Sequence, residues 1–127
     1  MNFLGKSSED YLETILILEK QHGFVRSIDI ANMQNVSRPS VNKAINNLKS
    51  LGLVEKEAYG DVTLTPLGRS KALEIIRRHT LIKYFLEDIL NVSSEVAEKD
   101  ACQMEHFLSI ETMEKLEKFL EKYNKKG

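Results

Sequence analysis

The sequence predicts a mainly α-helical protein with one small β-hairpin, and three observations support this prediction. Apolar residues recur three or four positions apart through most of the 127 residues, which is the period of a helix. The period shortens to two in residues 53–65, on both sides of a Gly-containing turn. Serine or threonine stands directly before several apolar-periodic runs, where an N-cap is expected.

The first helix is expected to begin at Ser7 or Ser8 and to end near Gln21. Ser7 and Asp10 have the spacing of a capping box, and Gly23 follows as a stop signal. The apolar stripe predicts a buried face made of Tyr11, Leu12, Ile15, Leu16 and Leu18.

Two further helices are expected before the hairpin. One covers residues 28–33 with Ser27 as its cap, and the next follows Ser37 and ends at Gly52. Pro39 lies in the first turn of the latter, where a missing N–H costs nothing. The residues expected to face inward are Ile28 and Ala31 in the second helix and Val41, Ala44, Ile45 and Leu48 in the third.

Residues 53–56 and 61–64 are predicted to form two short strands, joined by a turn at residues 59–61. Thr65 then caps a new helix that has Pro66 at its first position. Three helices followed by a hairpin is the order of a winged helix-turn-helix. Residues 1–65 are therefore predicted to form a DNA-binding domain of that kind.

Residues 66–127 are predicted to form an all-α domain for dimerisation. A long helix is expected over residues 66–90, about 35 Å in length, then one from Ser93 or Ser94 to about Leu108, and a last one after Ser109. The apolar face of the long helix is wider than the first domain can cover, which predicts an isologous homodimer. The apolar positions are Ala72, Leu73, Ile76, Leu81, Ile82, Phe85, Leu86 and Ile89 in the long helix, and Met113, Leu116, Leu120 and Tyr123 in the last.

Composition predicts a cytoplasmic protein that does not associate with membranes. No apolar run approaches the ~20 residues that span a bilayer, and residues 1–8 lack the apolar core of a secretion signal. The single cysteine, Cys102, excludes an intramolecular disulfide and fits a reducing compartment. The net charge of -1 conceals an asymmetry, since residues 1–86 carry 12 Lys and Arg against 9 Asp and Glu, and residues 87–127 carry 6 against 10.

The polar side of the third helix points to double-stranded DNA. Residues 36–52 hold Arg38, Lys43 and Lys49 with no acidic residue, and hydroxyls and amides lie between these cations. Such side chains contact phosphates and base edges, and Asn42 suits adenine. A solvated helix face is the ordinary alternative, but a whole face without acids beside a hairpin favours DNA. The predicted contacts are Ser37, Arg38, Pro39, Ser40, Asn42 and Lys43, with Lys56 and Tyr59 as weaker candidates.

Cys102, Glu105 and His106 have the i, i+3, i+4 spacing that places three side chains on one face of a helix. A thiolate, a carboxylate and an imidazole can coordinate a divalent first-row metal ion. Each candidate also has an ordinary alternative, as a helix cap, a surface residue or a small core residue. Further candidates, which complete a set of six if their helices pack together, are Asp10, Glu13 and His79.

Five segments resemble the diphtheria toxin repressor and manganese transport regulator family of metal-dependent transcriptional repressors. They cover nearly the whole chain in order, and the Cys-x-x-Glu-His element joined to Arg-His is fairly specific. The segments are Ser8-Glu-Asp-Tyr-Leu-Glu13, Ser37-Arg-Pro-Ser-Val41, Leu64-Thr-Pro-Leu-Gly68, Arg78-His79 and Cys102-Gln-Met-Glu-His106.

The resemblance implies a homodimeric repressor with Mn(II) or Fe(II) as corepressor, and other divalent first-row ions can bind in vitro. Metal would join the first helix to the long and fifth helices and so fix the spacing of two recognition helices. Cys102 matches the iron branch, whose second metal site has a Glu and a His where this chain has Lys83 and Glu98. The ligands that match the manganese branch are Asp10, Glu13, His79, Glu105 and His106.

Three alternatives stay open at this point. A winged-helix regulator could sense a non-metal ligand or a partner protein, and an interaction module could use the same fold without DNA. An enzyme is not expected, because Cys102 and His106 lie on one predicted helix with no oxyanion-hole glycine motif and no nucleotide-binding loop.

Overall fold

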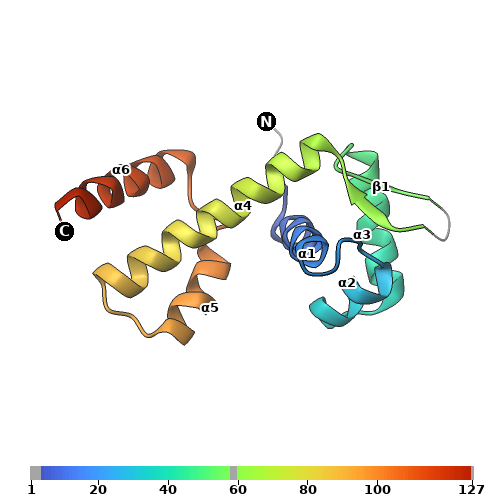
Figure 1. The fold of residues 1–127 in the computed structure, drawn as a ribbon, viewed down its shortest axis with the longest axis horizontal. Helices are drawn as coiled ribbons and strands as arrows, with labels where there is room; N and C mark the ends of the chain where they lie inside the picture. The colour runs from blue at the N-terminus through green and yellow to red at the C-terminus, as the bar shows by residue number, and fades with distance from the viewer. Residues whose placement is uncertain (1–3, 58–59, 127) are drawn as a thin grey trace. The chain divides into compact units, whose positions relative to one another are not determined.

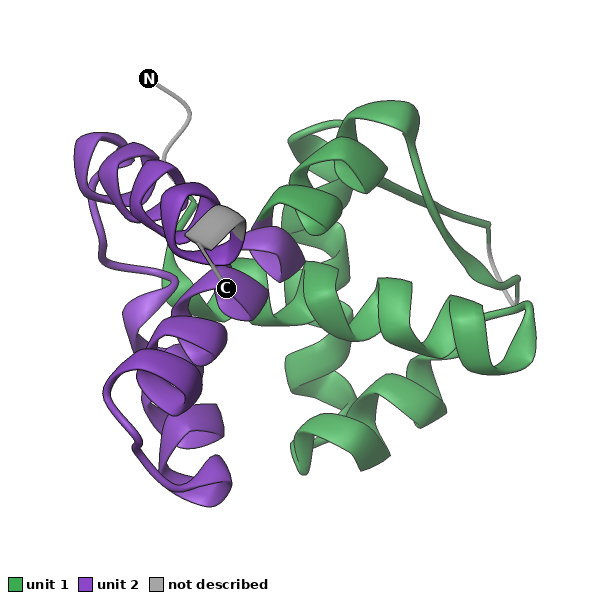
Figure 2. Cartoon of the chain, turned by 60° about the vertical axis from the view of Figure 1, so that its left-hand side comes forward, with its two compact units in different colours: residues 1–74 green, residues 75–127 purple. Residues whose placement is uncertain are grey.

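The computed structural model describes residues 4–57 and 60–126, and it confirms the mainly α-helical architecture. Within those residues, six α-helices and one antiparallel hairpin follow one another in the predicted order (Figure 1). The chain forms two compact units, residues 1–74 and 75–127 (Figure 2). The division falls inside helix α4 (Pro66–Tyr84), which begins where the all-α domain was predicted to begin.

The first unit contains α1 (Lys6–His22), α2 (Ser27–Gln34), α3 (Arg38–Ser50) and the hairpin of β1 (Val54–Lys56) and β2 (Val62–Leu64). Helix α1 packs against α2, α3 and β2, and β1 packs against α3. The two strands pair in antiparallel register. This is the winged helix-turn-helix arrangement that the order of elements predicted (Figure 1).

The core of the first unit is made mainly of the apolar faces predicted for α1 and α3. The five predicted residues of α1 are all buried, as are three of the four in α3. The prediction for α2 is wrong in part, because Ile28 is 40% exposed and Ile30 is buried beside Ala31. Residues two apart on a helix point in nearly opposite directions, so burial of Ile30 turns Ile28 outward.

Two of the predicted helix caps are wrong. Helix α1 begins at Lys6, with Gly5 rather than Ser7 as its N-cap, and α2 begins at Ser27 itself. Asp10 does not close a capping box, since its carboxylate pairs with Lys6 Nζ at 2.8 Å, one helical turn away. In α1 an i, i+4 ion pair therefore takes the place of the predicted capping contact of Asp10.

The start of α3 follows the predicted chemistry, after a left-handed residue that ends α2. Asn35 ends α2 in the left-handed conformation, with φ 55°. Ser37 is the N-cap of α3, and its Oγ accepts a hydrogen bond from the backbone N–H of Ser40 at 3.2 Å. Pro39 lies in the first turn of that helix, as expected.

The junction between the hairpin and α4 explains the glycine in Leu64-Thr-Pro-Leu-Gly68. Thr65 Oγ1 accepts from the backbone N–H of Gly68 at 3.0 Å and donates to the carbonyl oxygen of Gly52 at 2.6 Å. A Cβ on Gly68 would lie 2.8 Å from the carbonyl carbon of Leu53 and closer still to its oxygen. Only a residue without a side chain lets α4 start this close to the strand backbone.

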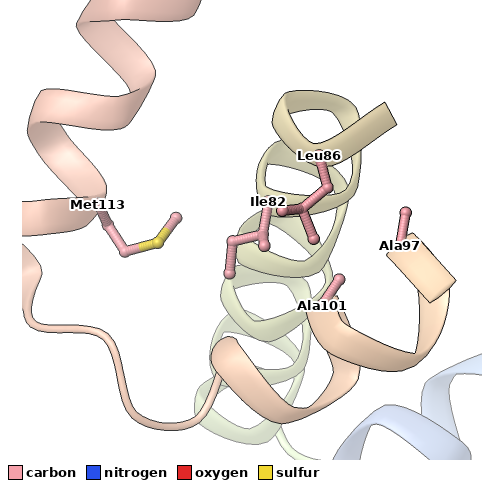
Figure 3. Close-up of a cluster of buried hydrophobic side chains, with 5 residues drawn as sticks. All are labelled: Ile82, Leu86, Ala97, Ala101 and Met113. Atoms are coloured by element: carbon pink, nitrogen blue, oxygen red, sulfur yellow. The ribbon is translucent and has the colours of Figure 1, made fainter. Parts of the chain in front are cut away.

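The second unit contains the C-terminal part of α4, a π-helical turn η1 (Phe85–Ile89), α5 (Ser94–Met104) and α6 (Ile110–Lys126). The long helix therefore does not stay α-helical to Leu90 as predicted, because its last turn widens to π geometry. A buried cluster holds these helices together (Figure 3), and its members are Ile82, Leu86, Ala97, Ala101 and Met113.

Contacts between α4 and α6 reinforce this cluster. Arg77 Nη2 lies 2.7 Å from Glu117 Oε2, and the Tyr84 hydroxyl donates to Asn124 Oδ1 at 2.6 Å. Several large apolar side chains nonetheless face outward in this unit: Leu90, Val96, Phe107, Ile110, Phe119 and Tyr123.

No helix among the described residues is both long enough and apolar enough to cross a membrane.

Candidate metal centre and nucleic-acid interface

The outward side of α3 presents every residue that was predicted to contact DNA. Burial of Val41, Ile45 and Leu48 fixes the rotation of the helix, so the polar positions between them face solvent. The hydroxyls of Ser37 and Ser40 lie 2.9 Å apart and share the capping role. The predicted contacts, all of them exposed, are Ser37, Arg38, Pro39, Ser40, Asn42 and Lys43.

The hairpin contributes less to this surface than α3 does. Lys49 Nζ, at the end of α3, donates to the carbonyl oxygen of Lys56 at 3.3 Å and so ties the helix to β1. The side chain of Lys56 is half-buried. Tyr59, the other hairpin candidate, lies outside the described residues.

The fifth helix ends earlier than predicted, and this changes the placement of its candidate ligands. Helix α5 stops at Met104 rather than near Leu108, so Glu105 is the C-cap and His106 lies in the following turn. Arg78 Nη1 donates to the carbonyl oxygen of Glu105 at 3.0 Å, a carbonyl left unpaired by the end of the helix. Of the three predicted ligands, only Cys102 therefore lies within the helix, Glu105 caps it and His106 follows it.

Glu105 is the centre of the candidate site. Its side chain is only 1% exposed, and it lies between two imidazoles. Oε2 is 2.9 Å from His79 Nδ1, and Oε1 is 3.2 Å from His106 Nε2. Both pairs lie within ion-pair distance, and the carboxylate has no further hydrogen-bond partner among the described residues. A cation bound here would have one carboxylate and two imidazoles within its reach.

His79 carries charge that balances this buried carboxylate. The neighbouring Glu105 raises the pKa of His79 to about 9, although partial burial opposes the rise, and Glu98 acts in the same direction. At neutral pH His79 is therefore an imidazolium in the metal-free protein, and it serves as the counter-ion of Glu105.

Cys102 lies with a residue that was not predicted as a ligand. Its Sγ, a ring nitrogen of His79 and a carboxylate oxygen of Glu98 lie within 4.8 Å of one another. Glu98 Oε2 is 3.0 Å from His79 Nε2. The sequence signal that could have identified Glu98 is its i, i+4 spacing from Cys102 on α5, but an acid on an exposed helix face is common without a ligand role.

The two remaining candidates, Asp10 and Glu13, belong to α1 in the first unit. Both side chains are half-buried. Asp10 pairs with Lys6, and its backbone carbonyl accepts from Gln34 Nε2 at 3.0 Å. Glu9, which directly precedes Asp10 and was not predicted as a ligand, is the buried acid of this helix at 7% exposure.

The donors of the second unit fit a divalent first-row metal ion. Glu105 offers two buried oxygens without hydrogen bonds, and His79 and His106 offer imidazole nitrogens within 3.2 Å of them. Carboxylate and imidazole donors suit Mn(II) and Fe(II), and the thiol of Cys102 suits the softer members of the series. Burial of an acid at this depth is costly unless a cation compensates it.

Two protein-family models together cover almost the whole chain. The model described as "Iron dependent repressor, N-terminal DNA binding domain" matches residues 3–62. The model described as "Iron dependent repressor, metal binding and dimerisation domain" matches residues 65–126.

Individual relatives agree with these models. The chain is 35% identical over 124 residues to an uncharacterised HTH-type transcriptional regulator of Methanocaldococcus jannaschii, covering 97% of this chain and 99% of that protein. It is 37% identical over 118 residues to the transcriptional regulator MntR of Escherichia coli, covering 93% of this chain and 76% of that protein.

Solved structures show the same likeness. A manganese-dependent transcriptional repressor in complex with manganese matches with a TM-score of 0.81 and 31% identity, over 89% of this chain and 52% of the other. IdeR of T. acidophilum matches with a TM-score of 0.75 and 33% identity, over 87% of this chain and 53% of the other. The chain thus spans about half the length of these solved chains.

Proposed function

Because the chain belongs to the iron-dependent repressor family, we propose that it is a metal-dependent DNA-binding repressor of metal-homeostasis genes, with Mn(II) or Fe(II) as corepressor. The family is one of transcriptional repressors and not of enzymes. The observation that carries the metal part is the buried Glu105 carboxylate, whose oxygens lie beside two imidazoles without hydrogen bonds.

The proposed ligands come from both units. In the second unit, Glu105 would bind through its buried oxygens, and the two imidazoles would bind through the nitrogens that face it. In the first, carboxylates on α1 would complete the set. When bound, the metal supplies positive charge that offsets the mutual repulsion of these acids. The full proposed set is Asp10, Glu13, His79, Cys102, Glu105 and His106.

The proposed DNA-binding surface is the exposed side of α3. Its N-terminus directs backbone N–H groups outward beside Arg38, which favours a phosphate there. Asn42 and Lys43 lie one turn further along the same exposed side, where base edges would be reached. In this proposal residues 1–65 bind an operator in double-stranded DNA and residues 66–127 bind metal and dimerise, in the cytoplasm where the DNA is.

Metal should act by favouring the arrangement of two protomers in which both α3 helices reach successive major grooves. Exposed apolar side chains of the second unit, such as Phe107 and Ile110, would form the apolar part of the dimer interface. A corepressor shifts this population only to the extent that it binds the DNA-competent state more tightly.

Affinity for operator DNA is expected to depend on the metal. With Mn(II) or Fe(II) present, a gel-shift titration should give a Kd at least about tenfold lower than with a chelator, since coupling free energies between sites are typically 1–3 kcal/mol. The probe is DNA from the promoter region of the chain's own gene or of metal-transport genes. Equal binding with metal and with chelator would contradict the corepressor role.

Replacing both cations at the start of α3 is expected to weaken DNA binding strongly without affecting metal binding. Arg38→Ala with Lys43→Ala removes two predicted phosphate or base contacts from an exposed face. The slope of log K against log salt should fall by about 2. A matched variant, Lys20→Ala with Lys118→Ala, removes two exposed cations elsewhere and should bind normally. Unchanged binding by the α3 variant would exclude this helix as the recognition element.

A further inference from the structure

The His79–Glu98–Cys102 group has the composition of a second cation site, and a side-chain cation already lies beside it. Lys83 Nζ, one turn after His79 on α4, lies 3.2 Å from Glu98 Oε2. The same oxygen is 3.0 Å from His79 Nε2. One carboxylate oxygen therefore contacts an ammonium and an imidazole at once.

Lys83 Nζ contacts the carboxylate of this group beside an open hollow. Lys83, Glu98 and His79 line one open hollow in the second unit, together with Thr80, Tyr84 and Glu87. An ion from solvent would reach Glu98 through that hollow and would meet the ammonium there. Glu98 Oε2 is thus held from two sides, by Lys83 Nζ at 3.2 Å and by His79 Nε2 at 3.0 Å.

Contact with Glu98 also determines which carboxylate each ring nitrogen of His79 faces. Nε2 lies 3.0 Å from Glu98 Oε2, and Nδ1 lies 2.9 Å from Glu105 Oε2. A carboxylate that accepts from one nitrogen of an imidazole sets its tautomer and orientation and makes the other nitrogen a better metal ligand. Glu98 is thereby a positioning residue for the site centred on Glu105.

We propose that Lys83 is the resident cation of the His79–Glu98–Cys102 group, that Glu98 held by it positions His79, and that each chain consequently binds a single metal ion. This inference rests on the proposed function, because it requires the site centred on Glu105 to bind metal. The inference goes beyond the proposed function because it assigns roles to Lys83 and Glu98 and sets the number of bound ions.

The number of bound ions tests the role of Lys83. Equilibrium dialysis of the whole chain against Mn(II), followed by metal analysis, should give one ion per chain. Lys83→Glu replaces the ammonium with a carboxylate, which joins Glu98 and Cys102 as a possible ligand. This variant should bind two ions per chain. Lys115→Glu, the same change at an exposed position of α6, should leave the number at one.

The affinity of the first ion tests the role of Glu98. Glu98→Ala should weaken metal binding by about 10- to 100-fold, as loss of an outer-shell partner does. Glu98→Gln keeps an oxygen that accepts from Nε2 and should recover most of the affinity. The ligand-field spectrum of bound Co(II) should change in the alanine variant and return in the glutamine variant. Glu95→Ala, an exposed acid on the same helix, is the matched control.

The outcomes separate this inference from the proposed function. If the natural chain binds no metal, the proposed function fails. If it binds two ions, or if Lys83→Glu still binds one, Lys83 is not the resident cation, and the repressor function is unaffected. An affinity and a Co(II) spectrum that are unchanged in Glu98→Ala would remove the positioning role. Because Glu98 is half exposed, folding of these variants is expected, and circular dichroism checks it.

Discussion

Glu105→Gln is expected to remove the metal response while leaving the metal-free protein folded. The amide has the shape of the carboxylate but carries no charge, so the central anionic ligand is lost. The loss of affinity should exceed the roughly 10- to 100-fold cost of losing an outer-shell partner. Folding should persist because a neutral amide needs no buried counter-ion, and His79 can release its proton once Glu105 no longer raises its pKa.

Thermal denaturation with and without Mn(II) measures this effect directly. A ligand at 100 times its Kd stabilises the folded state by about 2.7 kcal/mol. The natural chain should therefore melt at a higher temperature with metal, whereas Glu105→Gln should melt at the same temperature with or without it. Glu111→Gln, at an exposed position in the first turn of α6, should respond as the natural chain does. A full metal-induced rise in Glu105→Gln would show that the ion binds elsewhere.

Gly68→Ala is expected to destabilise the first unit strongly, although it adds a single methyl group. The added Cβ would overlap the carbonyl group of Leu53, which is backbone and cannot rotate away. Either α4 or the start of the hairpin must move, and the cap formed by Thr65 would be distorted. Overpacking of this kind costs about 1–3 kcal/mol and more where backbone must shift, so a loss of about 3 kcal/mol is expected.

Urea denaturation followed by circular dichroism gives the free energy of unfolding for this comparison. Gly5→Ala is the matched control, because a Cβ on Gly5 meets no atom within 4 Å and its φ is -71°. As a change of N-cap residue, it should cost about 1 kcal/mol or less. Equal stability of the two variants would mean that α4 does not need its close approach to Leu53.

Local patterns predicted the helices and the hairpin well because each depends on neighbours in sequence. The apolar stripe of α1 and the cap at Ser37 needed no information beyond a few residues on either side. Some of the failures lie where a distant contact competes with a local signal. The end of α5 is one case, since Arg78 on another helix takes the carbonyl of Glu105.

The sequence predicted the types of side chain in the candidate site, but not which of them lie next to one another. A helical spacing placed Cys102, Glu105 and His106 on one face, on the assumption that the helix continued past all three. In the fold, Cys102 lies with His79 and Glu98, and Glu105 lies between His79 and His106. In the sequence, Lys83 and Glu98 differ from the Glu and the His of the second metal site in the iron branch. Only the fold shows that the two side chains contact each other.

Sequence was thus sufficient for the order of elements, the winged helix, the polar face of α3 and the kinds of metal-binding side chain. These follow from periodicity and residue chemistry, which act over a few positions. Packing was required to show which donor atoms meet and that Lys83 neutralises Glu98. The physical reason is that electrostatic and steric contacts fall off within a few ångströms, and those distances are set by how α4 and α5 pack and where α5 ends.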